Sequence, residues 1–288
     1  MTAAGQTSTT HDTQRKDSSM NSVQASPSTG AIRRRGAVTR AALSLVLVGL
    51  LALGLVAQTA LSASAAQPPT GRTAVLPTAI PLSTFTAIGL PSGPAKIVAV
   101  RVRVPAGLHF THLHGGNVYN FMISGTLQVI GDGVTHTYHA GQFFWEPVGH
   151  VHTVVTTKPA EFFSLLCLTP QAAPVLPVQG ETTAPPPVTM LSTFAAIGLP
   201  SGPAKIVAVR VKVPVGVHFK HVHGGNVYNF MSSGTVQIIG DGVTHTYHAG
   251  QFFWEPVGHV HTLVGIKTAE FYGLQILTPH AAPVQAVQ

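Results

Sequence analysis

The feature that most constrains the fold of this chain is an internal duplication. Residues 82–170 align without a gap onto residues 191–279, at an offset of 109, and 72 of the 89 aligned positions are identical. A copy of about 90 residues is the size of one small domain with its own core. The sequence therefore predicts two domains of the same fold.

The segments outside the two copies have a different composition. Residues 171–190 between them, and residues 67–81 before the first, are rich in proline, threonine and small residues, which is typical of extended linkers. Residues 280–288 form a short tail. We therefore expect a first domain at 82–170 and a second at 191–279, joined by the proline-rich linker 171–190.

Residues 1–66 have the features of an export leader. An uncharged apolar run at residues 41–57 follows Arg33 to Arg35 and Arg40, and it precedes the small residues Ala63 to Ala65. A positive region, an apolar core and a small-residue cleavage site together are typical of a signal peptide. The alternative is an uncleaved membrane anchor at 41–57, a run at the short limit for a span. We expect an exported, extracytoplasmic protein, or one anchored to the membrane by this run.

Composition argues against two classes of function. The net charge of +7 is spread over a chain with only 9% charged residues, and no basic stripe with interleaved aromatic residues marks a nucleic-acid partner. The single cysteine, Cys167, aligns with Ile276 in the second copy, which disfavours a catalytic thiol. A buried apolar thiol is the better expectation.

Within one copy, the residue patterns are those of β-strands. Residues 96–104 are rich in β-branched residues and end in an alternation of apolar and basic residues, and the strand-like segments 120–124 and 126–130 flank Gly125. No window shows a convincing helical period. Short strands separated by Gly/Pro turns predict an all-β barrel or sandwich.

Histidine is the residue type that points to function. Fourteen of the 16 histidines lie in the two copies, seven in each. His112 and His114 are two residues apart in an expected strand, so their imidazoles project from one face, and His152 follows a Pro-x-Gly turn. Three neutral imidazoles that converge inside a barrel suit a divalent first-row transition metal and leave positions open for a substrate. The equivalent histidines of the second copy are His221, His223 and His261.

These motifs resemble those of the cupin superfamily. The pattern Gly107-x4-His112-x-His114-x10-Gly125 is similar to the first cupin motif, Gly141-x5-Pro147-x-Gly149-x2-His152 is similar to the second, and both recur in the second copy. The resemblance implies a bicupin of two tandem jelly-roll β-barrels, with the six histidines as metal ligands. It implies a divalent transition metal as cofactor (Fe, Mn, Cu, Ni or Zn) and a small-molecule substrate or ligand. By analogy of fold, it also implies barrels that pair within the chain or in a homodimer.

The chain departs from the family pattern at two positions. Most metal-binding cupins place a glutamate four residues after the second histidine, where this chain has Val118 and Val227. The asparagine that often follows the last histidine is replaced by Thr156 and Gly265. These departures make the three-histidine iron dioxygenases among cupins a closer analogy than bicupins with a glutamate ligand, such as oxalate decarboxylases.

Asn120 and Glu146 are the candidates to supply the missing oxygen ligand. Asn120 lies two residues beyond Val118 and so shares its inward face. Glu146 immediately precedes the Pro-x-Gly turn and so faces the histidines of that turn across a hairpin. As a ligand, a general base or an acceptor for an imidazole N–H, Glu146 and its equivalent Glu255 are the predicted catalytic residues.

Two classes of function fit these features. The first is an exported, metal-dependent enzyme of the oxygenase type that acts on a small chelating substrate, such as a diketone, a hydroxy-ketone or a carboxylate. The second is a non-enzymatic cupin that binds a metal or a small ligand outside the membrane. Four further histidines of the first copy are expected at the surface, the rim or the entrance of the site: His109, His136, His139 and His150.

Overall fold

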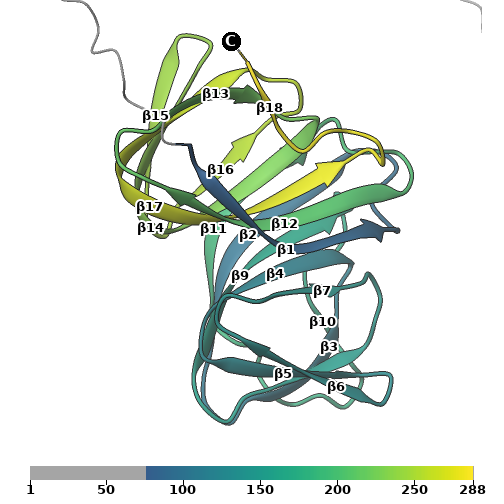
Figure 1. Ribbon diagram of the computed structural model, residues 1–288. Helices are drawn as coiled ribbons and strands as arrows, with labels where there is room; N and C mark the ends of the chain where they lie inside the picture. The colour runs from purple at the N-terminus through teal and green to yellow at the C-terminus, as the bar shows by residue number, and fades with distance from the viewer. Residues whose placement is uncertain (1–75, 288) are drawn as a thin grey trace, which may run out of the picture. The chain divides into compact units, whose positions relative to one another are not determined.

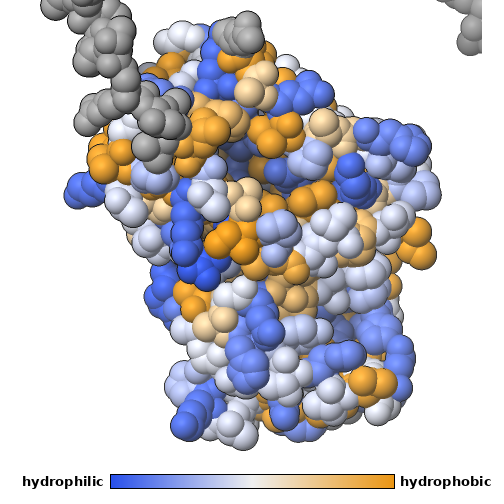
Figure 2. Space-filling model, viewed as in Figure 1, coloured by the Kyte–Doolittle hydropathy of each residue, from blue (hydrophilic) through white to orange (hydrophobic). Residues whose placement is uncertain are grey.

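The computed structural model describes residues 76–287, and the expected leader, with its apolar run at 41–57, lies outside them. The regular elements of residues 76–287 are all β-strands (Figure 1), so the all-β prediction is confirmed. In this part of the chain, no helix has the length and hydropathy needed to cross a membrane. Hydrophobic and hydrophilic residues are interspersed on the face drawn in Figure 2.

Ten strands form the first half of the described residues. They are β1 (Thr78–Ala87), β2 (Ala95–Val104), β3 (His109–Leu113), β4 (Gly116–Ser124), β5 (Thr126–Gly131), β6 (Val134–His139), β7 (Phe143–Glu146), β8 (His152–Val155), β9 (Ala160–Leu168) and β10 (Leu176–Pro177). Eight strands form the second half. They are β11 (Val188–Ala196), β12 (Ala204–Val213), β13 (His218–Val222), β14 (Gly225–Gly240), β15 (Val243–His248), β16 (Phe252–Glu255), β17 (His261–Leu277) and β18 (Gln285–Ala286).

The first repeat is a barrel of two five-stranded antiparallel sheets. One sheet has the order β11-β2-β9-β4-β7 and the other β10-β3-β8-β5-β6. Side chains from both sheets meet in one hydrophobic core, among them Val98 from β2, Phe110 from β3 and Leu127 from β5. Because side chains alternate along a strand, Ile97 and Ala99 point away from this core and into a second one.

Gly125 marks the corner at which β4 passes into β5. Its φ is +77°, and a Cβ atom at this position would lie 2.3 Å from the carbonyl oxygen of Pro159. Only glycine combines this backbone conformation with such a close approach. The glycine at the end of the first cupin-like motif is therefore a requirement of the barrel corner.

In the second repeat, the corresponding strands run together into one eight-stranded sheet. The long strands β14 and β17 pair over most of their length and join the two sides of the barrel. Register shifts between Met231 and Val236 mark the bend. The two repeats thus share one architecture, and in the second the strands β14 and β17 continue through the corner.

The two repeats exchange their first strands. Strand β1 pairs with β12 of the second repeat, with Phe85 opposite Ile206, and β11 pairs with β2 of the first, with Phe194 opposite Ile97 (Figure 1). The segment 171–190 also contains β10, which pairs with β3. The domain limits stay a prediction, but the segment expected as a linker contributes strands to the sheets.

A shared hydrophobic core lies between the repeats. It contains residues of both, and the rings of Phe163 and Phe230 stack with centroids 5.0 Å apart, while those of Phe121 and Tyr272 lie 5.4 Å apart. Strands β2 and β12 are therefore buried on both faces, which explains their nearly continuous apolar sequence. The two barrels pair within this chain, and a homodimer stays a prediction.

Candidate metal centre

Three strand positions bring the imidazoles of the first repeat together. His112 on β3 lies directly opposite His152 on β8, and His114 follows just beyond the end of β3. All three side chains are buried, and their ligand atoms lie within 4.8 Å of one another. The Nε2 atoms of His112 and His114 are 3.2 Å apart. The strand register thus places three nitrogen ligands around one point.

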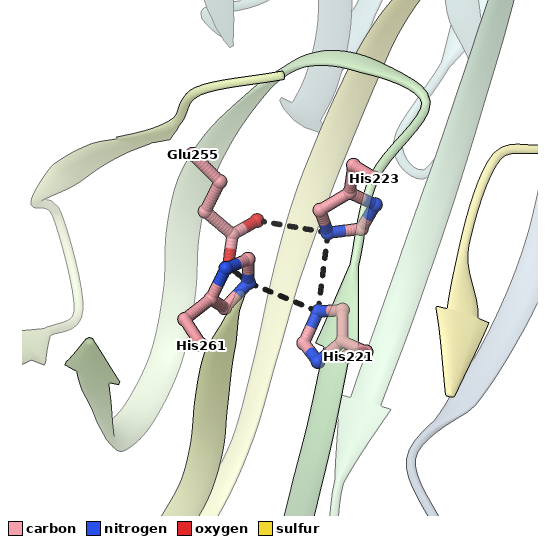
Figure 3. Close-up of side chains that lie close together, drawn as sticks. All are labelled: His221, His223, Glu255 and His261. Atoms are coloured by element: carbon pink, nitrogen blue, oxygen red, sulfur yellow. Dashed lines mark hydrogen bonds and ion pairs between the residues drawn. The ribbon is translucent and has the colours of Figure 1, made fainter. Parts of the chain in front are cut away.

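The second repeat forms the same cluster, with its carboxylate included (Figure 3). His221 on β13 lies opposite His261 on β17. The Nε2 atom of His221 is 3.1 Å from that of His223 and 3.1 Å from that of His261. The two repeats therefore contain two similar candidate centres, one in each barrel.

Backbone carbonyls fix the tautomer of these imidazoles. In the second repeat each Nδ1 faces a main-chain oxygen, at 3.0, 2.7 and 3.0 Å for Phe219, Pro283 and His259. A carbonyl oxygen only accepts hydrogen bonds, so Nδ1 has the hydrogen and Nε2 presents a lone pair to the centre. Lone pairs on adjacent Nε2 atoms cannot bond each other. The cluster is therefore arranged for a cation.

A buried glutamate completes each cluster. In the first repeat, Glu146 on β7 lies directly opposite Val118 on β4. Its Oε1 is 3.0 Å from Nε2 of His152 and its Oε2 is 3.3 Å from Nε2 of His114. Asn120 Nδ2 donates to Oε2 at 2.8 Å. The carboxylate that the family pattern places at position 118 is supplied here from the neighbouring strand.

Glu255 has the same surroundings in the second repeat. Its carboxylate is 2.8 Å from Nε2 of His261 and 3.4 Å from Nε2 of His223, and Asn229 donates to it at 2.8 Å. The amide of each asparagine thereby holds the carboxylate in one orientation, a role typical of residues that support a metal ligand.

The cluster combines an anionic carboxylate with imidazoles of different basicity. Burial by itself would raise the pKa of Glu146, but the adjacent imidazoles of His114 and His152 outweigh it and hold that pKa well below its usual range. Burial, reinforced by the neighbouring imidazoles, lowers the pKa of His112 to about 4, and burial lowers that of His221 to about 4. These two imidazoles remain neutral and able to act as ligands near neutral pH.

A cavity adjoins each cluster. The first has a volume of about 180 Å³, and its lining combines the site residues with strand valines and with residues of the inter-repeat segment such as Pro174, Val175 and Pro186. The second has a volume of about 160 Å³ and an equivalent position in its barrel. A volume of this size holds on the order of ten water molecules, or one small organic ligand.

The structure brings together all of the residues that the sequence singled out for chemistry. The six histidines form the two clusters, Glu146 and Glu255 contact them, and Asn120 supports Glu146. Their roles as ligands or catalytic groups stay predictions. Of the further histidines, His109, His136 and His139 are exposed. His150 adjoins the first cluster, with its ring 6.4 Å from that of His152, but its Nε2 faces Asp132, 2.7 Å from Oδ2.

Two supporting groups were missed because they lie outside the expected domains. The carbonyl oxygens of Pro174 and Pro283 accept hydrogen bonds from Nδ1 of His114 and His223, both at 2.7 Å. The sequence holds a clue to them, since Ala-Ala-Pro-Val occurs at 172–175 and again 109 residues later. The duplication therefore extends past the limits drawn for the repeats.

Known proteins share this fold. The family model of the cupin domain matches residues 100–167. This match lies within the first repeat. The second repeat, identical to it at 72 of 89 positions, has the same strand order and the same cluster, so the chain contains two tandem cupin folds. The resemblance to bicupins is confirmed.

No curated protein matches the sequence significantly. Among solved structures, the chain is similar to an oxalate decarboxylase with Mn(II) centres from Bacillus subtilis, with 16% identity over 76% of this chain and 82% of that one and a TM-score of 0.47. It is also similar to a salicylate 1,2-dioxygenase from Pseudaminobacter salicylatoxidans, with 11% identity over 62% and 71% and a TM-score of 0.45. Similarity at this level transfers no chemistry, so the function rests on the site itself.

Proposed function

We propose that each cupin repeat binds one divalent transition-metal ion through its three imidazole Nε2 atoms, and that the chain is a metal-dependent enzyme of the oxygenase type. The adjoining cavity would bring a small chelating substrate to the ion. The observation that supports this most directly is the orientation of the imidazoles. Their Nδ1 atoms are bound to backbone carbonyls, and their Nε2 lone pairs converge on one buried point.

The donor set fits such an ion in both type and spacing. Imidazole nitrogens with one carboxylate oxygen suit Fe, Mn, Cu, Ni or Zn. Nitrogen ligands about 2.1 Å from an ion lie about 3.0 Å apart in octahedral geometry and about 3.4 Å apart in tetrahedral geometry. The distances of 3.1 and 3.2 Å between Nε2 atoms lie between these values.

The chain's own groups have defined roles in this proposal. When bound, the ion supplies Lewis acidity and, if redox-active, electron transfer to dioxygen. Glu146, or Glu255 in the second repeat, has carboxylate oxygens at the edge of the cavity that can take a proton from the substrate. The asparagine beside it holds the carboxylate in place, and the valine walls exclude water from the reacting groups.

Elemental analysis of the purified full-length chain tests the metal proposal. The wild type, reconstituted in turn with Fe, Mn, Cu, Ni and Zn, should hold one ion per repeat. His112→Ala should lose the ion of the first repeat, His221→Ala that of the second, and the double variant both. His150→Ala is the control, because His150 is paired with Asp132 outside the cluster. A metal content that does not respond to His112→Ala and His221→Ala would refute the proposal.

Oxygen consumption tests the enzymatic part. With a redox-active metal bound, we expect turnover of at least one member of a panel of diketones, hydroxy-ketones and small carboxylates, and its loss when both Glu146 and Glu255 are replaced by glutamine. Full metal occupancy without turnover across the panel would leave the alternative function, a non-enzymatic cupin that binds a metal or a small ligand. That alternative also predicts that added metal raises the melting temperature.

We further propose that the protein works outside the cytoplasm, on the basis of the leader-like sequence at residues 1–66. Cell fractionation with N-terminal sequencing tests this. A soluble, exported chain that begins close to residue 67 would support export with cleavage. An intact chain in the membrane fraction would support the anchor at 41–57, and an intact cytoplasmic chain would refute both.

A further inference from the structure

The walls of the two cavities differ although the clusters beside them match. Two inward-facing positions of the same strand are replaced between the repeats: Ser164 and Leu166 on β9 become Gly273 and Gln275 on β17. All four lie on the barrel side of the strand, since the alternate residues of β9 and β17 belong to the shared core.

In the first cavity these positions complete an apolar wall. Leu166 lies between Val98 and Val118 on the flanking strands, and all three side chains line the cavity. Ser164 donates a hydrogen bond to Oδ1 of Asn120, so its hydroxyl is used within the protein. A ligand in this cavity meets hydrocarbon where it faces Leu166.

In the second cavity the same wall contains an amide. Gln275 is only 7% exposed and lines the cavity, and its neighbours in register on the flanking strands are Val207 and Val227. Its Oε1 is buried and accepts no hydrogen bond from any group of residues 76–287. Gly273, in place of serine, has no hydroxyl to donate to Asn229.

An unpaired acceptor inside a cavity has a direct consequence for binding. Burying an acceptor without a partner is costly, and a ligand that donates a hydrogen bond to it recovers that cost. A site of this kind therefore discriminates strongly against an analogue of the same shape that lacks the donor.

We propose that the two cupin sites have diverged in the ligands they accept. The second site takes a small ligand that presents a hydroxyl or N–H group to Gln275, and the first takes one that is apolar at that position. This inference extends the proposed function by naming a ligand class for each site, and it makes Gln275 a specificity-determining residue. It depends on the cavity walls and not on the metal.

Phenol and toluene are a matched pair of probes, because they share shape and differ in one hydroxyl. On the full-length chain loaded with metal, isothermal titration should show one site that binds phenol about tenfold more tightly than toluene and one without that preference. Gln275→Leu should remove the preference, and Leu166→Gln should create it at the first site. Each substitution installs the residue of the other repeat, so the fold has already accommodated it once.

Three results would overturn the inference: the same ratio of phenol to toluene affinity in the wild type and both variants, a preference that survives Gln275→Leu, or no saturable binding of either probe. Melting temperatures of the variants show whether the fold is retained. Repeating the titration on the metal-stripped chain separates the two proposals. If the metal proposal is wrong, His112→Ala and His221→Ala will leave the metal content unchanged. The preference for phenol, and its loss in Gln275→Leu, can still be measured in that case.

Discussion

Truncating Phe121 should destabilise both repeats at once. Phe121 is fully buried in the shared core, and its ring centroid is 5.2 Å from that of Phe143 in its own repeat and 5.4 Å from that of Tyr272 in the other. Replacing a core phenylalanine with alanine costs about 3–5 kcal/mol, through lost burial and the cavity left behind. Because the cavity would open between the repeats, we expect the cost to fall on the folding of both.

The chain contains one tryptophan in each repeat, and each packs on an exchanged first strand, so it reports on its own barrel and on the contact between the two. Trp145 packs on Phe85 and Trp254 on Phe194, both with ring centroids 4.9 Å apart. Unfolding in urea is followed by fluorescence in two backgrounds, Trp145→Phe and Trp254→Phe. With a slope of about 3 kcal/mol per M urea, Phe121→Ala should lower the midpoint by about 1–1.7 M in both backgrounds.

Phe144→Ala is the matched control. Phe144 is equally buried but belongs to the core of the first barrel, where its ring stacks on that of Tyr138 at 4.5 Å. We expect Phe144→Ala to lower the urea midpoint reported by Trp145 by at least as much as the urea midpoint reported by Trp254. If Phe121→Ala left the Trp254 midpoint unchanged, the shared core would not couple the repeats and the reasoning would be wrong.

Three further predictions concern single residues. Replacing Glu146 with glutamine should weaken metal binding to the first repeat about 10–100-fold, and Glu255→Gln should do the same to the second. Competition with a chelator measures this affinity, and an unchanged affinity would rule out a role for the carboxylate in metal binding. Burial raises the pKa of Cys167 to about 12, so at pH 8 only about 1 in 10,000 thiols is ionised, and a thiol reagent should label it after denaturation but not before. Gly125→Ala should lower the unfolding free energy by about 2–5 kcal/mol, because a Cβ atom there would meet the carbonyl of Pro159. Gly133→Ala, with a similar φ and open space around it, should lower it by about 1–2 kcal/mol. Equal losses, measured by chemical denaturation, would contradict this.

The all-β fold could be predicted from the sequence, but the exchange of first strands could not. Alternation with a period of two identifies the strands, and glycine and proline identify the turns. Which sheet a first strand joins depends on which sheet edge has a matching sequence. Residues 82–87 and 191–196 differ at one position only, and the strands they pair with, which begin at Ala95 and Ala204, share their first eight residues. Each first strand therefore fits either partner equally well, and only the three-dimensional structure distinguishes them.

The side chains of the candidate site could be predicted from the sequence, whereas the main-chain groups that support them could not. The spacing of His112 and His114 fixes their common face, and the Pro-x-Gly turn brings His152 back to them. The carbonyl oxygens that orient the imidazoles belong to Pro174 and Pro283 in segments read as linker and tail. Any residue type has a carbonyl group, so its position depends on the course of the chain and not on residue identity.

The carboxylate shows how a site can keep its chemistry while a motif changes. Val118 and Glu146 face each other across β4 and β7, so a carboxylate on either strand reaches the same imidazoles. At position 146 it gains the amide of Asn120, which in the first repeat is itself held by Ser164. The valine at 118 then belongs to the cavity wall, where a glutamate would have placed charge. Moving the carboxylate thus keeps an anion beside the imidazoles and gives the cavity a more apolar surface. For that reason, the absence of the motif glutamate at 118 does not leave the imidazoles without a carboxylate.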